Sequence, residues 1–169
     1  MDMVMPFFSF VLYNFPACMT ILALVAGTFC VFFEKERTTS EIYLKKLMFF
    51  AVGLTGIWGF VVHGFYPVQT AKYMGWPNSP FQFQVAAACL GLGITGIVGW
   101  CASQSFRVAT TIFTASLLWI DASTHLFQMT MVGGFVPRNV GSFFYNDLAL
   151  PLLLIFFLYR NKCSGCKAS

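Results

Sequence analysis

Charged residues are scarce in this sequence. Only 9% of the 169 residues are Asp, Glu, Lys or Arg, whereas 58% are hydrophobic and the mean hydropathy is +0.74. A soluble domain has about 25% charged residues, because water must solvate its surface. The scarcity of charge therefore excludes a soluble enzyme, and the high hydrophobicity excludes a disordered chain. The class that remains is a small polytopic membrane protein, whose main partner is the lipid bilayer.

Clusters of positive charge are also missing. The ten Lys and Arg residues are spread over the whole chain, whereas a nucleic-acid-binding surface gathers them in a basic patch. We therefore expect no nucleic-acid partner. No Lys or Arg precedes the first apolar segment, although a signal peptide begins with a positively charged region. That segment is therefore expected to be a retained membrane span.

Five apolar segments are present, and they predict an all-α membrane protein. Most of them reach the ~20 residues that a helix needs to cross the hydrocarbon core of a bilayer. We expect a single integral membrane domain, residues 1–169, built as a polytopic bundle of about five transmembrane helices. The expected spans cover residues 7–33, 47–66, 83–105, 108–132 and 142–160.

The basic residues favour one orientation in the membrane. With five crossings, eight of them fall in the first connection, the third connection and the C-terminal tail, and only Lys72 and Arg138 fall on the other side. The eight are Lys35, Arg37, Lys45, Lys46, Arg107, Arg160, Lys162 and Lys167. Cytoplasmic loops are enriched in Lys and Arg, so we predict an N-terminus outside and a C-terminus in the cytoplasm.

The connections carry local signals of their own. The polar stretch at residues 34–46 is expected to be a solvated connector, in which Thr39 or Ser40 could cap a short helical entry into the second span. After the second span, Pro67 suits the first position of a helix and Gly75 suits the position just after its end, which predicts a short interfacial helix. Ser79 and Gln82 have the spacing of a capping box at the start of the third span.

Glycines recur with the same spacing in the second and third spans. The six residues are Gly53, Gly56, Gly59, Gly93, Gly96 and Gly99. Small residues on one face of an apolar helix let a neighbouring backbone approach closely. The two spans run antiparallel, so we expect them to cross near Gly56 and Gly96. Such faces could also bind a second copy of the chain or another subunit of a membrane complex.

The stretch GWPNSPFQ, residues 75–82, carries a resemblance. It is similar to a loop in a group of uncharacterised bacterial integral-membrane proteins, catalogued as a domain of unknown function. The resemblance runs from about His63 to Asp147 and includes a Pro-x-Asn-x-Gly loop at residues 137–141. It implies a bacterial inner membrane and assigns no activity. Members of that group often have an acidic residue near the position of Gln84, and the glutamine here weakens the prediction of a metal site.

Ionisable residues inside the spans are the functional candidates, because each costs about 2.5–3.5 kcal/mol on insertion scales. His63 lies in the second span, while Asp121 and His125 share one face of the fourth at i,i+4 spacing. A rise of ~1.5 Å per residue places all three in the outer half of the membrane. The predicted outward-facing polar pocket consists of His63, Gln84, Asp121, His125 and Asp147.

Each member of this set also has a structural interpretation. Asp121 could accept a hydrogen bond from His125, His63 could lie at the membrane interface, and Asp147 could be a helix N-cap. The sequence leaves three functions open. The first is a pocket that binds a small ligand or ion, in a transport or binding role. The second is a membrane-embedded enzyme with an acid-base site, or with a zinc or iron site at His63, Asp121 and His125. The third is a structural subunit.

Overall fold

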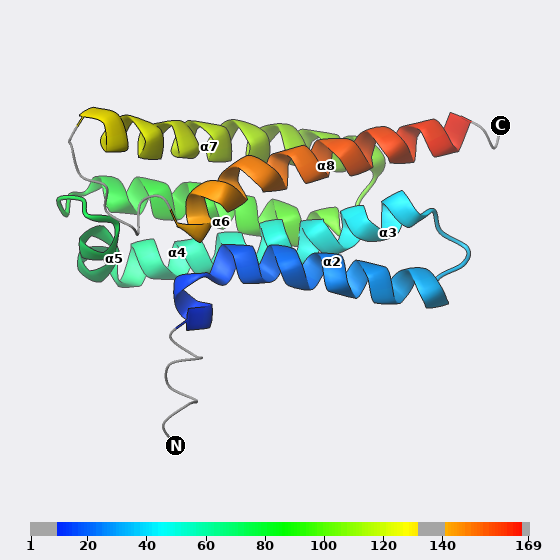
Figure 1. Ribbon diagram of the computed structural model, residues 1–169, viewed down its shortest axis with the longest axis horizontal. Helices are drawn as coiled ribbons and strands as arrows, with labels where there is room; N and C mark the ends of the chain where they lie inside the picture. The colour runs from blue at the N-terminus through cyan, green and yellow to red at the C-terminus, as the bar shows by residue number, and fades with distance from the viewer. Residues whose placement is uncertain (1–9, 132–140, 167–169) are drawn as a thin grey trace, which may run out of the picture.

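The structure, a computed structural model, describes residues 10–131 and 141–166. Within these ranges every regular element is a helix, and the long helices lie side by side along one axis (Figure 1). In chain order they are α2 (Phe15–Phe33), α3 (Thr39–Lys46), the π-helix η1 (Leu47–Leu54), α4 (Thr55–Phe65), α5 (Pro67–Met74), α6 (Phe81–Gly99), α7 (Gln104–Met131) and α8 (Ser142–Cys166). The expected all-α bundle is confirmed.

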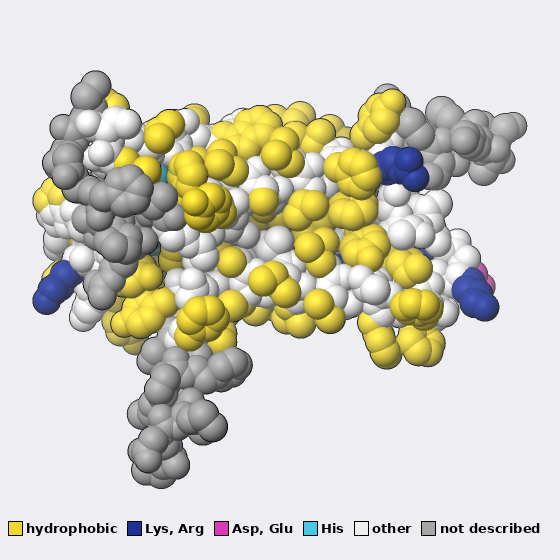
Figure 2. Space-filling view, in the orientation of Figure 1, with side chains coloured by type: hydrophobic (Ala, Val, Ile, Leu, Met, Phe, Trp, Pro, Cys, Tyr) yellow, Lys and Arg dark blue, Asp and Glu magenta, His cyan; other side chains and the backbone are white. Residues whose placement is uncertain are grey.

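Four helical segments are long and apolar enough to cross a membrane. They are Phe15–Phe33, Thr39–Phe65, Phe81–Gly99 and Ser142–Asn161. The 28-residue helix α7 is long enough, but its Thr, Asp and His side chains lower its hydropathy. It runs beside the other helices in the bundle (Figure 1), so its crossing stays a prediction. Hydrophobic side chains cover the middle of the face in Figure 2, and Lys and Arg appear there only near the two ends.

The second apolar segment begins earlier than its hydropathy suggests. Helices α3, η1 and α4 form one continuous helix, Thr39–Phe65, so the solvated connector expected at residues 34–46 is wrong over its second half. Thr38 caps this helix, because its Oγ1 accepts a hydrogen bond from the Glu41 backbone N–H at 3.2 Å. Ile42 and Leu44 are buried against the other helices, and their burial stabilises helix α3 despite its polar sequence.

The continuous helix formed by η1 and α4 approaches α6 closely along its glycines. A Cβ atom on Gly56 would lie 2.6 Å from Gly93 Cα, and one on Gly96 would lie 2.7 Å from Gly53 Cα. Real Cβ atoms do not come this close, so only glycine allows the contact. The close crossing predicted near Gly56 and Gly96 is present, with Gly56 opposite Gly93 and Gly53 opposite Gly96. These faces are therefore buried inside the chain.

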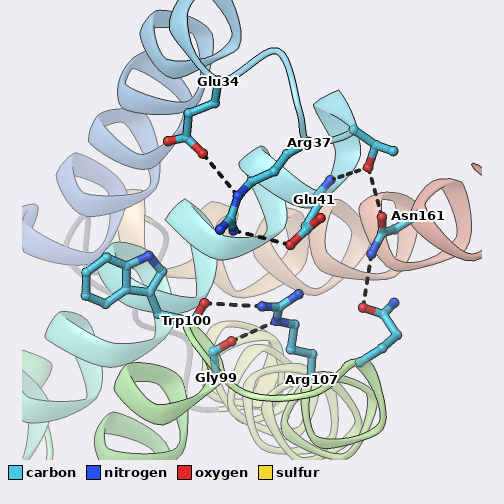
Figure 3. A network of polar contacts seen from close by, with 9 residues as sticks. Glu34, Arg37, Glu41, Gly99, Trp100, Arg107 and Asn161 are labelled. Atoms are coloured by element: carbon cyan, nitrogen blue, oxygen red, sulfur yellow. Dashed lines mark hydrogen bonds and ion pairs between the residues drawn. The ribbon is translucent and has the colours of Figure 1, made fainter.

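A polar network joins the helices at the end of the bundle opposite α5 (Figure 3). The Arg107 guanidinium, 6% exposed, donates from Nε to the Gly99 carbonyl at 2.8 Å and from Nη2 to the Trp100 carbonyl at 3.2 Å. Thr38 Oγ1 donates to Asn161 Oδ1 at 3.0 Å, and Asn161 Nδ2 donates to Gln104 Oε1 at 3.1 Å. These bonds tie together the starts of α3 and α7 and the second half of α8.

Helix α5 lies at the other end of the bundle (Figure 1). It begins at Pro67 and ends before Gly75, which adopts the left-handed conformation with φ of 74°. Both signals predicted from the sequence are confirmed. This end carries the pocket described below.

Candidate functional site

The five residues predicted to form a polar pocket all line one cavity. The cavity has a volume of about 970 Å³ and is bordered by residues of α2, η1, α4, α5, α6, α7 and α8. Its wall is mainly apolar or aromatic, and the polar side chains gather towards the end that carries α5. The predicted residues in the wall are His63, Gln84, Asp121, His125 and Asp147. Asn139, in the Pro-x-Asn-x-Gly loop that follows α7 in the chain, lies outside the described residues.

Three of these side chains converge. Asp121 and His125 lie one turn apart on α7, and Asp147 projects from α8. One potential ligand atom from each side chain lies within 4.8 Å of the other two. His125 is 1% exposed and Asp147 is 6% exposed, while Asp121 is the most accessible. Helix α8 begins at Ser142, so Asp147 is inside the helix and the alternative that it is an N-cap is wrong.

His63 lies on another part of the cavity wall. Its Nδ1–H donates to Gln82 Oε1 at 2.6 Å, which links α4 to α6. His63 is outside the group formed by Asp121, His125 and Asp147. The capping box predicted for Gln82 is wrong, because Pro80 is the N-cap of α6 and no side chain among the described residues caps the helix. The buried Gln82 therefore orients the imidazole of His63, a role that the sequence reasoning missed.

Trp76 covers His125 from the loop between α5 and α6. The two rings are 6.0 Å apart between centroids, and the angle between their planes is 32°. Trp76 Nε1 donates to Gln128 Oε1 at 2.6 Å. An aromatic residue close to a membrane surface is typical of an interfacial aromatic belt, and this general tendency does not predict a contact with His125. The available signal for this contact was Gln128, which is three residues after His125 and therefore on the same side of α7.

Helix α8 is held in position by polar bonds to the N-terminal part of the chain. Thr20 Oγ1 donates to Asn146 Oδ1 at 2.7 Å, and both side chains are buried. Ser142 Oγ donates to Asn14 Oδ1 at 2.6 Å. Because Asn146 directly precedes Asp147, the bond to Thr20 helps to fix the direction in which the Asp147 side chain points.

Comparison with protein families finds one match. The model of a family of unknown function, DUF6790, matches residues 13–166, which cover every helix from α2 to α8. The chain belongs to this family. The match contains the whole region over which the sequence resembled an uncharacterised membrane family. Comparisons of the chain with curated proteins and with solved structures gave no match. DUF6790 carries no assigned activity, so the function has to be argued from the site.

Proposed function

We propose that this protein binds a small amphipathic ligand in the cavity between its transmembrane helices. The observation that carries the proposal is the cavity of about 970 Å³ with three convergent ionisable groups in a mainly apolar wall. Pockets for small molecules have volumes of about 300–1,000 Å³ and combine apolar walls with a few placed polar groups. The wall would take an apolar body, and the polar end would take a head group.

The charges of the wall indicate the head group. Two Asp and two His side chains line the cavity, and none of the described lining residues is Lys or Arg. A group that donates hydrogen bonds or carries positive charge fits this wall best.

The packing beyond the cavity favours binding over transport. A core cluster of buried apolar side chains fills the bundle towards the end opposite α5. It includes Leu44, Leu47, Met48, Val52, Leu92, Leu150 and Leu154. Three of these residues, Val52, Leu92 and Leu150, also border the cavity. This core offers no polar surface to an ion or solute, so the cavity is best explained as a blind pocket.

We also propose the orientation indicated by the basic residues, in the inner membrane of a bacterium. The α2–α3 connection, the α6–α7 connection and the end of α8 lie at one end of the bundle (Figure 1). That end therefore carries Arg37, Lys46 and Arg107, whereas α5 at the other end carries Lys72. By the positive-inside rule the pocket and the N-terminus face outwards, and the C-terminus is cytoplasmic.

Photolabelling in lipid nanodiscs tests the pocket. A long-chain alcohol with a diazirine in its chain is the probe, and peptide mass spectrometry locates the labelled residues. We expect labelling of cavity-lining residues of α4, α6 and α7. Ala88→Phe fills the cavity and should reduce this labelling at least several-fold, because Ala88 borders it. Ala87→Phe is the matched control, since Ala87 is the exposed neighbour.

Two safeguards make the labelling result decisive. Both variants must elute as wild type on size exclusion, and Ala88→Leu replaces Ala88→Phe if the larger side chain prevents folding. Labelling confined to the exposed helix faces would contradict the pocket. An equal reduction of labelling by the Ala88 and Ala87 variants would also contradict it.

The convergence of Asp121, His125 and Asp147 favours a second candidate, a membrane-embedded enzyme. An imidazole beside carboxylates is suited to move a proton to or from a bound molecule. Lipid-soluble molecules that co-purify with wild type and with His125→Ala would be compared by mass spectrometry. An enzyme should leave substrate on the variant and product on the wild type. The same molecule on both proteins would support a binding function alone.

A further inference from the structure

We propose that Asp121, His125 and Asp147 form a binding site for a divalent transition-metal ion such as Zn²⁺. This inference rests on the proposed function, because the ion would lie in the wall of the ligand pocket. It differs from the set expected from the sequence, in which His63 took the place of Asp147. The observation behind it is the convergence of one potential ligand atom from each of the three side chains within 4.8 Å.

The donor chemistry of the group fits such an ion. Imidazole nitrogen and carboxylate oxygen are both ligands of Zn²⁺ and of neighbouring first-row metals. Three protein ligands with one open position are the arrangement of a catalytic zinc site, whereas structural sites have four. Here the open position would face the cavity, where water or the head group of a ligand can reach the ion. The cavity also gives the ion a path of entry.

The charge balance supports the same conclusion. Two carboxylates at this distance repel each other when both are ionised, and an apolar environment strengthens the repulsion. No described residue that lines the cavity is Lys or Arg. A divalent cation would neutralise both carboxylates at once, and an imidazole ligand adds no charge of its own. Such a neutral assembly avoids most of the cost of burying charge inside a membrane protein.

The geometry requires a small adjustment. Bonds of about 2.0–2.2 Å in a tetrahedral site put the ligand atoms about 3.4 Å apart. The three atoms, within 4.8 Å of one another, must therefore close by up to about 1.4 Å. Asp121 and His125 share a helix and Asp147 lies on its neighbour α8, so side-chain rotation supplies most of this movement. His63 is held away by its 2.6 Å bond to Gln82, which makes it a control on the same wall.

The test measures metal binding by the full chain, purified in detergent without a histidine tag. The protein is stripped with a chelator, loaded with Zn²⁺ or Co²⁺ and freed of excess metal. Elemental analysis then gives the metal per chain, and the visible absorption of bound Co²⁺ reports its ligands. We expect about one ion per wild-type chain. His125→Ala and Asp147→Asn should weaken binding at least tenfold, and His63→Ala should bind as wild type.

The outcomes separate this inference from the proposed function. The metal site would be overturned if the wild type retains neither metal. It would also be overturned if His125→Ala and Asp147→Asn retain as much metal as the wild type. If His63→Ala also loses the ion, the assignment of ligands is wrong. Asp121→Asn provides a second ligand variant if a buried substitution prevents folding, because Asp121 is the most accessible of the three. Photolabelling that Ala88→Phe suppresses would still support the pocket after a negative metal result.

Discussion

Gly56 of α4 faces Gly93 of α6 so closely that a Cβ atom on Gly56 would lie 2.6 Å from Gly93 Cα. This contact fixes the distance between the two helices that carry His63 and Gln82. One wall of the cavity therefore depends on the absence of side chains at two positions. The interface is internal to the chain, which explains the repeated glycines without a second subunit.

Gly56→Ala is expected to destabilise the protein. The added methyl group must push apart two backbones, and overpacking of this kind costs about 1–3 kcal/mol. Gly91→Ala on α6 is the matched control, because a Cβ there meets no atom of the described part of the chain within 4 Å. It should be neutral or raise stability by up to about 1 kcal/mol, since alanine favours a helix. Reversible unfolding of both variants in mixed micelles measures the difference, and equal stabilities would contradict the close contact.

Arg107→Met is expected to weaken the end of the bundle opposite the pocket. The variant loses two charged hydrogen bonds to the Gly99 and Trp100 carbonyls at the C-terminal end of α6. A hydrogen bond to a charged group contributes about 1.5–3 kcal/mol, and the helix dipole also favours a cation there. Arg37→Met is the control. The Arg37 ion pairs at 3.6 and 3.4 Å are exposed and worth about 0–1 kcal/mol. Thermal unfolding in detergent should therefore show a larger loss of stability for Arg107→Met than for Arg37→Met.

The hydrogen bond between Thr20 and Asn146 should be measurable by a double-mutant cycle. Thr20→Val and Asn146→Ala each remove one partner of a buried 2.7 Å bond between α2 and α8. Interhelical hydrogen bonds in membrane proteins have coupling energies of about 0.6 kcal/mol, and up to about 1.7 kcal/mol. A cycle made with Thr95→Val instead of Thr20→Val should show no coupling, because the hydrogen bonds of Thr95 within the described ranges go to carbonyls of its own helix. Strict additivity in the first cycle would argue against the bond.

The orientation can be tested with cysteine labelling in intact cells. Cys101 is exposed in the α6–α7 connection, which we place in the cytoplasm. In a Cys163→Ser/Cys166→Ser background, a membrane-impermeant maleimide should label Cys101 only after the membrane is permeabilised. Asn78→Cys, made in the same background with Cys101→Ser, places an exposed thiol near the pocket and should react in intact cells. The reverse pattern would invert the topology.

The sequence predicted a large part of the helical architecture because its signals are local. Pro67 and Gly75 act within a single turn, and they marked the bounds of α5 correctly. The same local reasoning failed at residues 39–46 and at Gln82. The polar stretch at residues 39–46 forms a helix because Ile42 and Leu44 are buried by distant helices. Gln82 has the spacing of a capping residue, but its side chain bonds to His63 on α4 instead.

By itself, the sequence determined the class of the protein. Low charge and long apolar segments require a membrane environment, and the i,i+4 spacing of Asp121 and His125 puts them on one helix face. Only the tertiary structure decided that Asp147 joins them while His63 pairs with Gln82. Periodicity defines which side of a helix a residue occupies, but not which neighbour that side meets. The neighbour depends on the register and the lateral position of the helices. Contacts between residues far apart in the sequence determine both, as between Gly56 and Gly93 or between Thr20 and Asn146.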